Sequence, residues 1–306
     1  MNLREWALPV YTILMQIATG ALTAQWIIYS ILHFKYRRKD AERLNKVPLL
    51  IVLVTIATAM IGSHFHLSRP YFSFLSVINI RSSWLSREIV FTVLFFNAVA
   101  LLGLMHWFNI GRHKLRIRLG WLAVLMGWAN EYCLVRIYLL PTQIAWNTYT
   151  TIVLFYFSTV LLGAIASAAI LIMDFKYAEI RNLAYTSVQA FVIREALRWI
   201  AVISVLMVGA TIVGNYYQII QFRGGGEITQ ISLELLLNLY PVLFGMRLFA
   251  IVAGVGLFVI AIHFQAHSSK PLGELIKPVY FAYLLVLIGE ILDRFLFYAT
   301  HVRTGV

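Results

Sequence analysis

Eight stretches of this chain are long and apolar enough to cross a membrane, and this feature constrains the fold more than any other. A membrane-spanning helix needs about 20 mostly apolar residues. Inside lipid every backbone polar group must be satisfied within the segment, so each stretch is expected to be a helix. The polar–apolar alternation of a β-barrel strand is absent. We therefore predict an all-α polytopic membrane protein with eight transmembrane helices in a single domain, 1–306. The predicted spans are 7–32, 48–66, 89–108, 119–140, 149–173, 196–221, 241–266 and 278–301.

The composition excludes several other classes of protein. The chain is 61% hydrophobic and 12% charged, whereas soluble domains are about 45–50% apolar and about 25% charged. The net charge of +12 comes from short basic runs between apolar stretches, so no single face is expected to bind nucleic acid. Cys133 is the single cysteine, which excludes an intrachain disulfide and an iron–sulfur cluster held by this chain.

The distribution of Lys and Arg predicts the orientation. With the N-terminus outside, the connections on the inner side carry fourteen Lys and Arg residues and the outer segments carry six. Cytoplasmic loops carry the excess of positive charge. We therefore expect both termini on the outer, periplasmic side of the cytoplasmic (inner) membrane of a prokaryote.

Ionisable and polar side chains gather toward the outer ends of the predicted helices. An ionisable group inside the membrane costs about 2.5–3.5 kcal/mol on insertion scales, so each one is a candidate for function. The outer group comprises His64, His66, Glu88, Arg136, Tyr138, Arg247, Arg294, Tyr298 and His301. Two carboxylates, Glu131 and Glu290, lie deeper in the fourth and eighth spans.

The deeper carboxylates have more than one interpretation. Glu290 and Arg294 are spaced i,i+4, so their charged groups can meet on one helix face as a structural pair. Glu131 and Arg136 are five residues apart, a poorer fit for pairing on one helix. Glu131 is thus expected to pair with another helix or to stay protonated.

The outer group suits a lipid-soluble carrier of two electrons and two protons. A quinol needs a proton acceptor, which His can provide near neutral pH, and a cation such as Arg to stabilise a developing oxyanion. It also needs an apolar slot for its ring and tail. Composition alone does not separate this from a secondary transporter or proton-conducting subunit. Such a protein would use Glu131, Glu290, Asp293 and Arg294 as a relay.

Three histidines lie near the inner ends of the predicted spans, and a fourth follows in a connection. A haem would need pairs of histidines on facing helices, and the spacing of His33, His106 and His263 does not exclude one. His113 is placed in a loop. We expect these side chains to be interfacial or solvated rather than ligands.

Three motifs resemble those of dimethyl sulfoxide reductase membrane anchor subunits. The run His66-Leu67-Ser68-Arg69-Pro70, continuing to Ser83–Ile89, resembles a family signature that reads roughly H-L-G-x-P…S-x-L-S-x-E-I. Ser68, Phe72 and Asp293 depart from residues common in that family. The other two motifs are Arg136-Ile137-Tyr138 with Trp146 downstream, and Gly289–Arg294 with Phe297 and Tyr298.

The resemblance implies an anchor that exchanges electrons between menaquinol or menaquinone and a four-cluster iron–sulfur subunit, without haem or metal of its own. That subunit passes electrons to a molybdopterin catalytic subunit that holds molybdenum bis-guanine dinucleotide. The iron–sulfur subunit is expected to dock outside, near the connection Leu67–Arg87. By motif position His66 and Glu88 are the quinol-site base and its acidic partner. We expect the quinol to contact His64, Arg136, Tyr138, Glu290, Arg294 and Tyr298.

Overall fold

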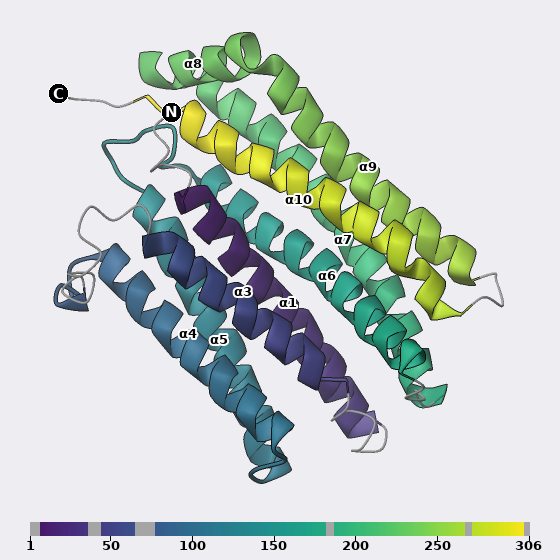
Figure 1. Cartoon of the computed structure of the whole chain (residues 1–306). Coiled ribbons are helices and arrows are strands. Elements are labelled where there is room, and N and C mark those ends of the chain that lie inside the picture. The colour runs from purple at the N-terminus through teal and green to yellow at the C-terminus, as the bar shows by residue number, and fades with distance from the viewer. Residues whose placement is uncertain (1–6, 36–43, 65–76, 182–186, 267–270, 303–306) are drawn as a thin grey trace.

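The computed structural model describes residues 7–35, 44–64, 77–181, 187–266 and 271–302, and this part of the chain is helical without strands. Eight long helices account for most of it, joined by turns and short helical segments (Figure 1). The elements are α1 (Ala7–Lys35), α3 (Lys46–His64), α4 (Trp84–Trp107), α5 (His113–Tyr138), α6 (Tyr149–Ile180), α7 (Ser187–Arg223), α8 (Glu227–Glu234), η3 (Leu235–Leu239), α9 (Pro241–Ala266), η4 (Leu272–Leu275) and α10 (Ile276–Ala299).

Each predicted span coincides with one of the eight long helices, but the hydropathy of α5 sets it apart. Seven of the described helices are long and apolar enough to cross a membrane, and α5 is not among them. The reason is its composition: Lys114, Arg116 and Arg118 lie in its first two turns, and Asn130 and Glu131 lie further along. The structure therefore supports an all-helical membrane protein with seven candidate spanning helices, one fewer than predicted.

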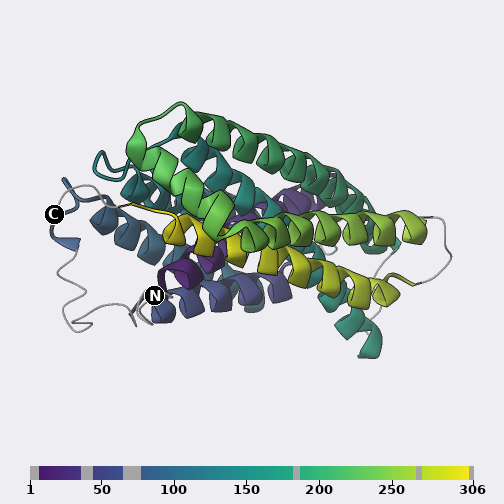
Figure 2. The same cartoon turned by 90° about the horizontal axis from the view of Figure 1, so that it is seen from above.

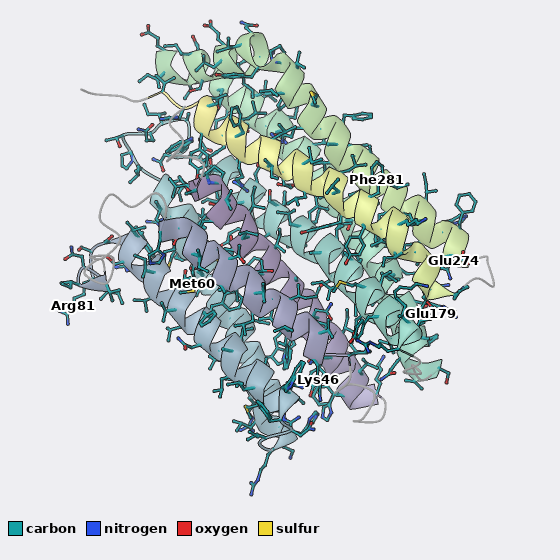
Figure 3. All side chains as sticks on the ribbon, viewed as in Figure 1. Lys46, Met60, Arg81, Glu179, Glu274 and Phe281 are labelled. Atoms are coloured by element: carbon teal, nitrogen blue, oxygen red, sulfur yellow. The ribbon has the colours of Figure 1, made fainter. Side chains whose placement is uncertain are left out.

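The axes of the long helices are roughly parallel, and successive long helices run in opposite directions. This arrangement is visible in two perpendicular views (Figures 1 and 2). The first residues of α1 and the last residues of α10 lie at the same end of the bundle. Arg81 lies at that end, whereas Lys46, Glu179 and Glu274 lie at the other (Figure 3). We call these the site end and the opposite end.

Helices α1 and α6 form the centre of the bundle. Helix α1 contacts α3, α5, α6 and α10, and α6 also contacts α7. The two helices approach closely at Gly20 and Gly163, because a Cβ atom on Gly163 would lie 2.2 Å from the Gly20 backbone. Small residues permit such close packing of helices in membranes. The Ser167 hydroxyl adds a hydrogen bond to the Ala21 carbonyl oxygen at 3.1 Å.

Two features of the chain differ from the sequence-based expectation. Helix α7 has 37 residues, about 55 Å at 1.5 Å per residue, and is therefore longer than a hydrocarbon core of about 30 Å. The segment after Gly224–Gly226 lies between two of the predicted spans, and it contains α8 and η3. With eight residues, α8 is too short to produce the apolar run by which the spans were identified.

Candidate functional site

Glu88 of α4 is buried at the site end. Its side chain is 6% exposed, and the Tyr11 hydroxyl of α1 lies within hydrogen-bonding reach of the carboxylate. Helix α4 starts at Trp84, where the Ser83 hydroxyl caps it by accepting a hydrogen bond from the Ser86 backbone N–H at 3.3 Å. This N-cap places the acid in the second turn of the helix, facing the bundle interior.

A chain of hydrogen bonds leads from Glu88 into the bundle. The Tyr11 hydroxyl lies 2.7 Å from Thr92 Oγ1. The Thr92 hydroxyl has two acceptors for its one proton, Asn130 Oδ1 at 2.8 Å and the Glu88 backbone carbonyl oxygen at 2.9 Å. Asn130 Nδ2 has no hydrogen-bond partner among the described residues. Residues of α1, α4 and α5 thus form a continuous polar path that starts at a carboxylate.

Glu131 follows directly on α5 and is fully buried. Its Oε2 accepts a hydrogen bond from Thr159 of α6 at 3.4 Å. Its Oε1 has no hydrogen-bond partner in the part of the chain that the structure describes. Glu131 therefore contacts another helix through a hydroxyl group and not through the ion pair that was one of its two expected states.

Glu290 and Arg294 of α10 are both buried, but they do not form the predicted ion pair. Arg294 Nη2 lies 3.9 Å from Asp293 Oδ2 and donates to Gln16 Oε1 at 3.4 Å. Glu290 Oε2 has no hydrogen-bond partner among the described atoms. The i,i+4 spacing allowed the pair, but Arg294 is directed toward α1 and α6 instead.

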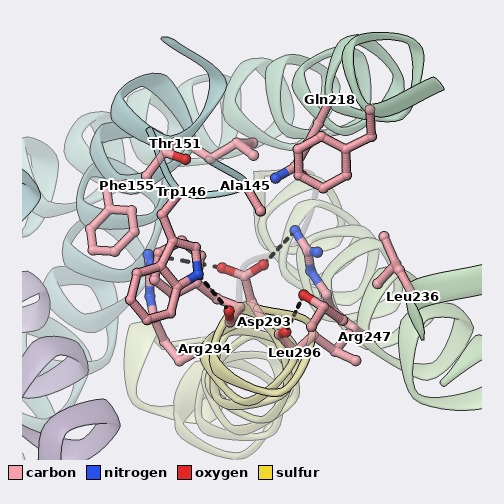
Figure 4. Close-up of a pocket in the computed structure, with 14 residues that line it drawn as sticks. Ala145, Trp146, Thr151, Phe155, Gln218, Leu236, Arg247, Asp293, Arg294 and Leu296 are labelled. Carbon is pink, nitrogen blue, oxygen red and sulfur yellow. Dashed lines mark hydrogen bonds and ion pairs between the residues drawn. The ribbon is translucent and has the colours of Figure 1, made fainter. Parts of the chain in front are cut away.

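Asp293 joins two arginines beside a small polar cavity (Figure 4). Arg247 Nη2 of α9 lies 2.8 Å from Asp293 Oδ1, and the Arg294 guanidinium carbon lies 3.6 Å from the centre of the Phe155 ring. The cavity has a volume of about 40 Å³, which is enough for a few water molecules. Its polar lining side chains are Trp146, Thr151, Gln218, Arg247, Asp293, Arg294 and Thr300.

An aromatic group covers this cavity at the site end. The Tyr138 and Tyr298 hydroxyls are hydrogen-bonded to each other. The Trp146 ring stacks on Phe297 with centroids 5.0 Å apart and on His301 with centroids 4.8 Å apart. Trp146 Nε1 also donates to the Phe297 carbonyl oxygen at 2.9 Å. These contacts hold the connection after α5 against the end of α10.

Two of the predicted site residues, His64 and Arg136, do not join this network in the part of the chain that the structure describes. His64 is exposed, and its Nδ1 contacts the Met60 carbonyl oxygen of its own helix at 2.7 Å. Arg136 packs over the Trp84 ring at 4.9 Å, on the α4–α5 face. His66 lies outside the described residues, as does part of the predicted docking connection (residues 67–76). The remaining predicted residues, Glu88, Tyr138, Glu290, Arg294 and Tyr298, are brought together at the site end.

Sequence reasoning missed the contribution of α1. Tyr11 and Gln16 contact Thr92 and Arg294, respectively, although neither was selected as a site residue. A signal was present, because Thr12, Gln16, Thr19 and Thr23 recur at intervals of four, three and four on an apolar helix. Such spacing places polar groups on one helix face.

The histidines at the opposite end differ from the sequence-based expectation. His106 and His113 are 1% and 9% exposed, so they are not solvated. His113 begins α5 instead of lying in a loop. Its Nε2 lies 2.5 Å from His33 Nδ1, and its Nδ1 lies 3.3 Å from the Tyr29 hydroxyl. Only His263 of these four is exposed as expected.

Comparison with known proteins is consistent with the motifs. The family model of the DMSO reductase anchor subunit (DmsC) matches residues 1–300. One subunit of the anaerobic dimethyl sulfoxide reductase of Haemophilus influenzae is 29% identical over 179 residues, covering 56% of this chain and 61% of that protein. The anaerobic dimethyl sulfoxide reductase subunit YnfH of Escherichia coli is 25% identical over 308 residues, covering 99% of this chain and 96% of that protein. The resemblance seen in the motifs is thus confirmed, and the chain belongs to the DMSO reductase anchor subunit family.

Proposed function

We propose that this chain is the membrane anchor subunit of a molybdenum/iron–sulfur oxidoreductase and exchanges electrons between menaquinol and a partner iron–sulfur subunit. Family membership supports the anchor role. The observation that carries the electron-exchange role is the buried path from Glu88 through Tyr11 and Thr92 to Asn130. Burial alone does not indicate function, but an acid joined to hydroxyl groups in one path gives a bound quinol a proton acceptor.

The chemistry of the side chains fits a quinol, whereas the cavity beside Asp293 is too small for its ring. Menaquinol, when bound, supplies two electrons and two protons. Glu88 is placed to accept a proton, and Tyr11 and Thr92 to pass it on. Arg294 supplies positive charge near the same end. A cavity of about 40 Å³ accommodates water only, so we place the ring at the outer ends of α3 and α4, beside Glu88 and His66.

We propose that the partner subunits dock at the site end. The predicted docking segment, residues 67–87, follows α3 and ends in the first turn of α4, and its described part exposes Val77, Ile78 and Arg81. A four-cluster iron–sulfur subunit on this surface would bring its nearest cluster close to Glu88. The molybdopterin catalytic subunit would bind to that subunit and not to the membrane.

We further propose eight membrane crossings, with both termini on the outer side of a prokaryotic inner membrane. Helix α5 has 26 residues and runs beside α4. Its polar residues Asn130 and Glu131 are fully buried in the bundle, so its lower hydropathy does not prevent a crossing. Reporter fusions at Ser73 and Asp40 should report opposite sides of the membrane, and the same side for both would refute this topology.

The anchor role is tested by purification of the chain from its native membrane. We expect iron–sulfur and molybdopterin subunits to copurify and menaquinol to reduce the complex. A His66→Arg variant should assemble and accept electrons from artificial dyes, while quinol-driven activity falls by about 10²-fold or more, as for loss of a general base. Isolation of the chain as a stable protein without partners would contradict the proposal.

A second candidate function is proton conduction or secondary transport. The observation in its favour is that Glu131 Oε1 and Glu290 Oε2 are buried without hydrogen-bond partners among the described residues. Arg294 interacts electrostatically with both acids. Proton or substrate uptake into vesicles that contain only this chain would establish this function, and the absence of uptake together with quinol oxidation by the complex would exclude it.

A further inference from the structure

A large apolar groove lies between α1, α6 and α7, away from the candidate site. Its volume is about 680 Å³, within the range of ligand-binding pockets, about 300–1,000 Å³. Trp128 of α5 contributes to its wall. The lining is largely aliphatic and aromatic, and it includes Ile27, Ile31, Phe191, Trp199, Ile200 and Ile203. It shares no residue with the polar cavity or the path that starts at Glu88.

The groove has the depth of one leaflet of a membrane. Along α1 it extends from Gly20 to Lys35, about 22 Å at 1.5 Å per residue. Half of a bilayer, with its headgroup region included, is about 20–22 Å. Lys35 is the last residue of α1, so the groove opens at the opposite end of the bundle and closes near its middle.

The mouth of the groove is positively charged. Lys35 lines it and is exposed, and no described carboxylate forms an ion pair with it. The one acid in the lining, Glu195, lies 2.5 Å from Arg198 of the same helix. The neighbouring arginine therefore offsets the charge of Glu195, and Lys35 remains to attract an anion.

At the deep end of the groove, the polar groups of Thr23 and Trp128 are already hydrogen-bonded within the protein. The Thr23 hydroxyl donates to the Thr19 carbonyl oxygen at 2.7 Å and accepts a hydrogen bond from Trp128 Nε1 at 3.1 Å. A quinol ring placed there would find neither a proton acceptor nor an unused donor. The methyl end of an acyl chain needs neither.

We propose that this groove binds one acyl chain of an anionic phospholipid of that leaflet, with its phosphate beside Lys35. Lipid tails surround the whole protein, so the hydrophobic effect does not favour the groove over the bilayer. Retention instead depends on the fit of the acyl chain between α1 and α7 and on the attraction of Lys35 for the phosphate.

Native mass spectrometry of the intact complex, exchanged into detergent with phosphatidylglycerol or phosphatidylcholine, tests this proposal. We expect one phosphatidylglycerol to be retained by the unmodified complex. Ala24→Phe fills the groove, and the retained phosphatidylglycerol should fall at least tenfold. Val205→Phe, on an exposed part of α7 outside the groove, adds the same ring and should retain the lipid.

Lys35→Gln is a second variant that leaves the groove intact. Because Lys35 is exposed, we do not expect this substitution to change the fold, so a loss of lipid preference would come from the lost charge. The variant should remove the preference for phosphatidylglycerol over phosphatidylcholine. Equal retention of phosphatidylglycerol by the unmodified complex and by Ala24→Phe would overturn the proposal. So would a quinone, or a second copy of the protein, that is bound in the unmodified complex and lost in Ala24→Phe. Quinol-driven activity is measured on the same samples, so failure of the lipid site is distinguishable from failure of the quinol function.

Discussion

The two ends of the bundle both bury ionisable side chains, but they do so in different ways. At the site end, carboxylates and arginines from α4, α5, α9 and α10 lie among hydroxyl and amide groups of α1 and α6. At the opposite end, His33, His106 and His113 pack against the Tyr29 ring. The rings there contact one another directly, and His33 and His113 share a hydrogen bond.

This difference shows that burial of ionisable groups does not by itself identify the functional site. The site end combines acids, cations and a cavity large enough for water. It also contains polar atoms without hydrogen-bond partners among the described residues, such as Glu131 Oε1 and Arg294 Nε. A carboxylate oxygen of this kind can accept a proton from water or a bound molecule, and an arginine N–H can donate a hydrogen bond to one.

The largest effect is expected from Asp293→Asn at the site end. The substitution keeps the shape of the side chain but leaves Arg247 and Arg294 without the carboxylate between them. Loss of one partner of a buried ion pair costs about 3–5 kcal/mol. The free energy of unfolding in mixed micelles should fall by this amount, and a loss below about 1 kcal/mol would show that the two arginines are stabilised by other groups.

The next largest effect is expected on the rate of quinol-driven electron transfer, and two variants, one at each end of the bundle, measure it. Glu88→Gln removes the proton acceptor at the start of the polar path, so quinol-driven electron transfer should fall by about 10²-fold or more. Electron transfer from artificial dyes should be unchanged. The matched variant at the opposite end, His113→Gln, should leave quinol-driven transfer within about threefold, because we assign that histidine a packing role. A larger loss in His113→Gln than in Glu88→Gln would reverse the assignment of the two ends.

A pair of tyrosine variants sharpens the comparison with a smaller effect. Tyr11→Phe removes the hydroxyl beside Thr92, and Tyr29→Phe removes the hydroxyl beside His113. Each should lower the free energy of unfolding by about 1 kcal/mol, the contribution of one hydrogen bond. Only Tyr11→Phe should also slow quinol-driven electron transfer. Equal rates in the two variants would mean that Tyr11 lies outside the proton path.

The smallest effect serves as a baseline for the buried groups. Lys176 and Glu179 form an exposed pair at the opposite end, with a separation of 2.8 Å. Exposed ion pairs contribute about 0–1 kcal/mol. Glu179→Gln should therefore change the free energy of unfolding by less than about 1 kcal/mol, and this change should shrink in high salt.

The helices could be predicted from the sequence, because apolar runs of this length permit little else in lipid. The end at which Glu88, Arg294 and Tyr298 gather also followed from alternation of the helices. The partners of these residues did not follow, because contacts between helices depend on how each helix is rotated. Arg294 illustrates this: spacing favoured Glu290, but packing directs the guanidinium toward Phe155 and Gln16. The burial of His106 and His113 was missed for the same reason.

Photoaffinity labelling with an azido-naphthoquinone tests the central assignment most directly. The intact complex is labelled, digested, and analysed by mass spectrometry to locate the modified peptide. The proposed quinol position predicts labels at the outer ends of α3 and α4, in peptides that contain His64, His66 or Glu88, and reduced labelling in the presence of excess menaquinone. Labels confined to the groove peptides around Ile31 or Trp199 would contradict the account, because they would place the quinol at the opposite end of the bundle.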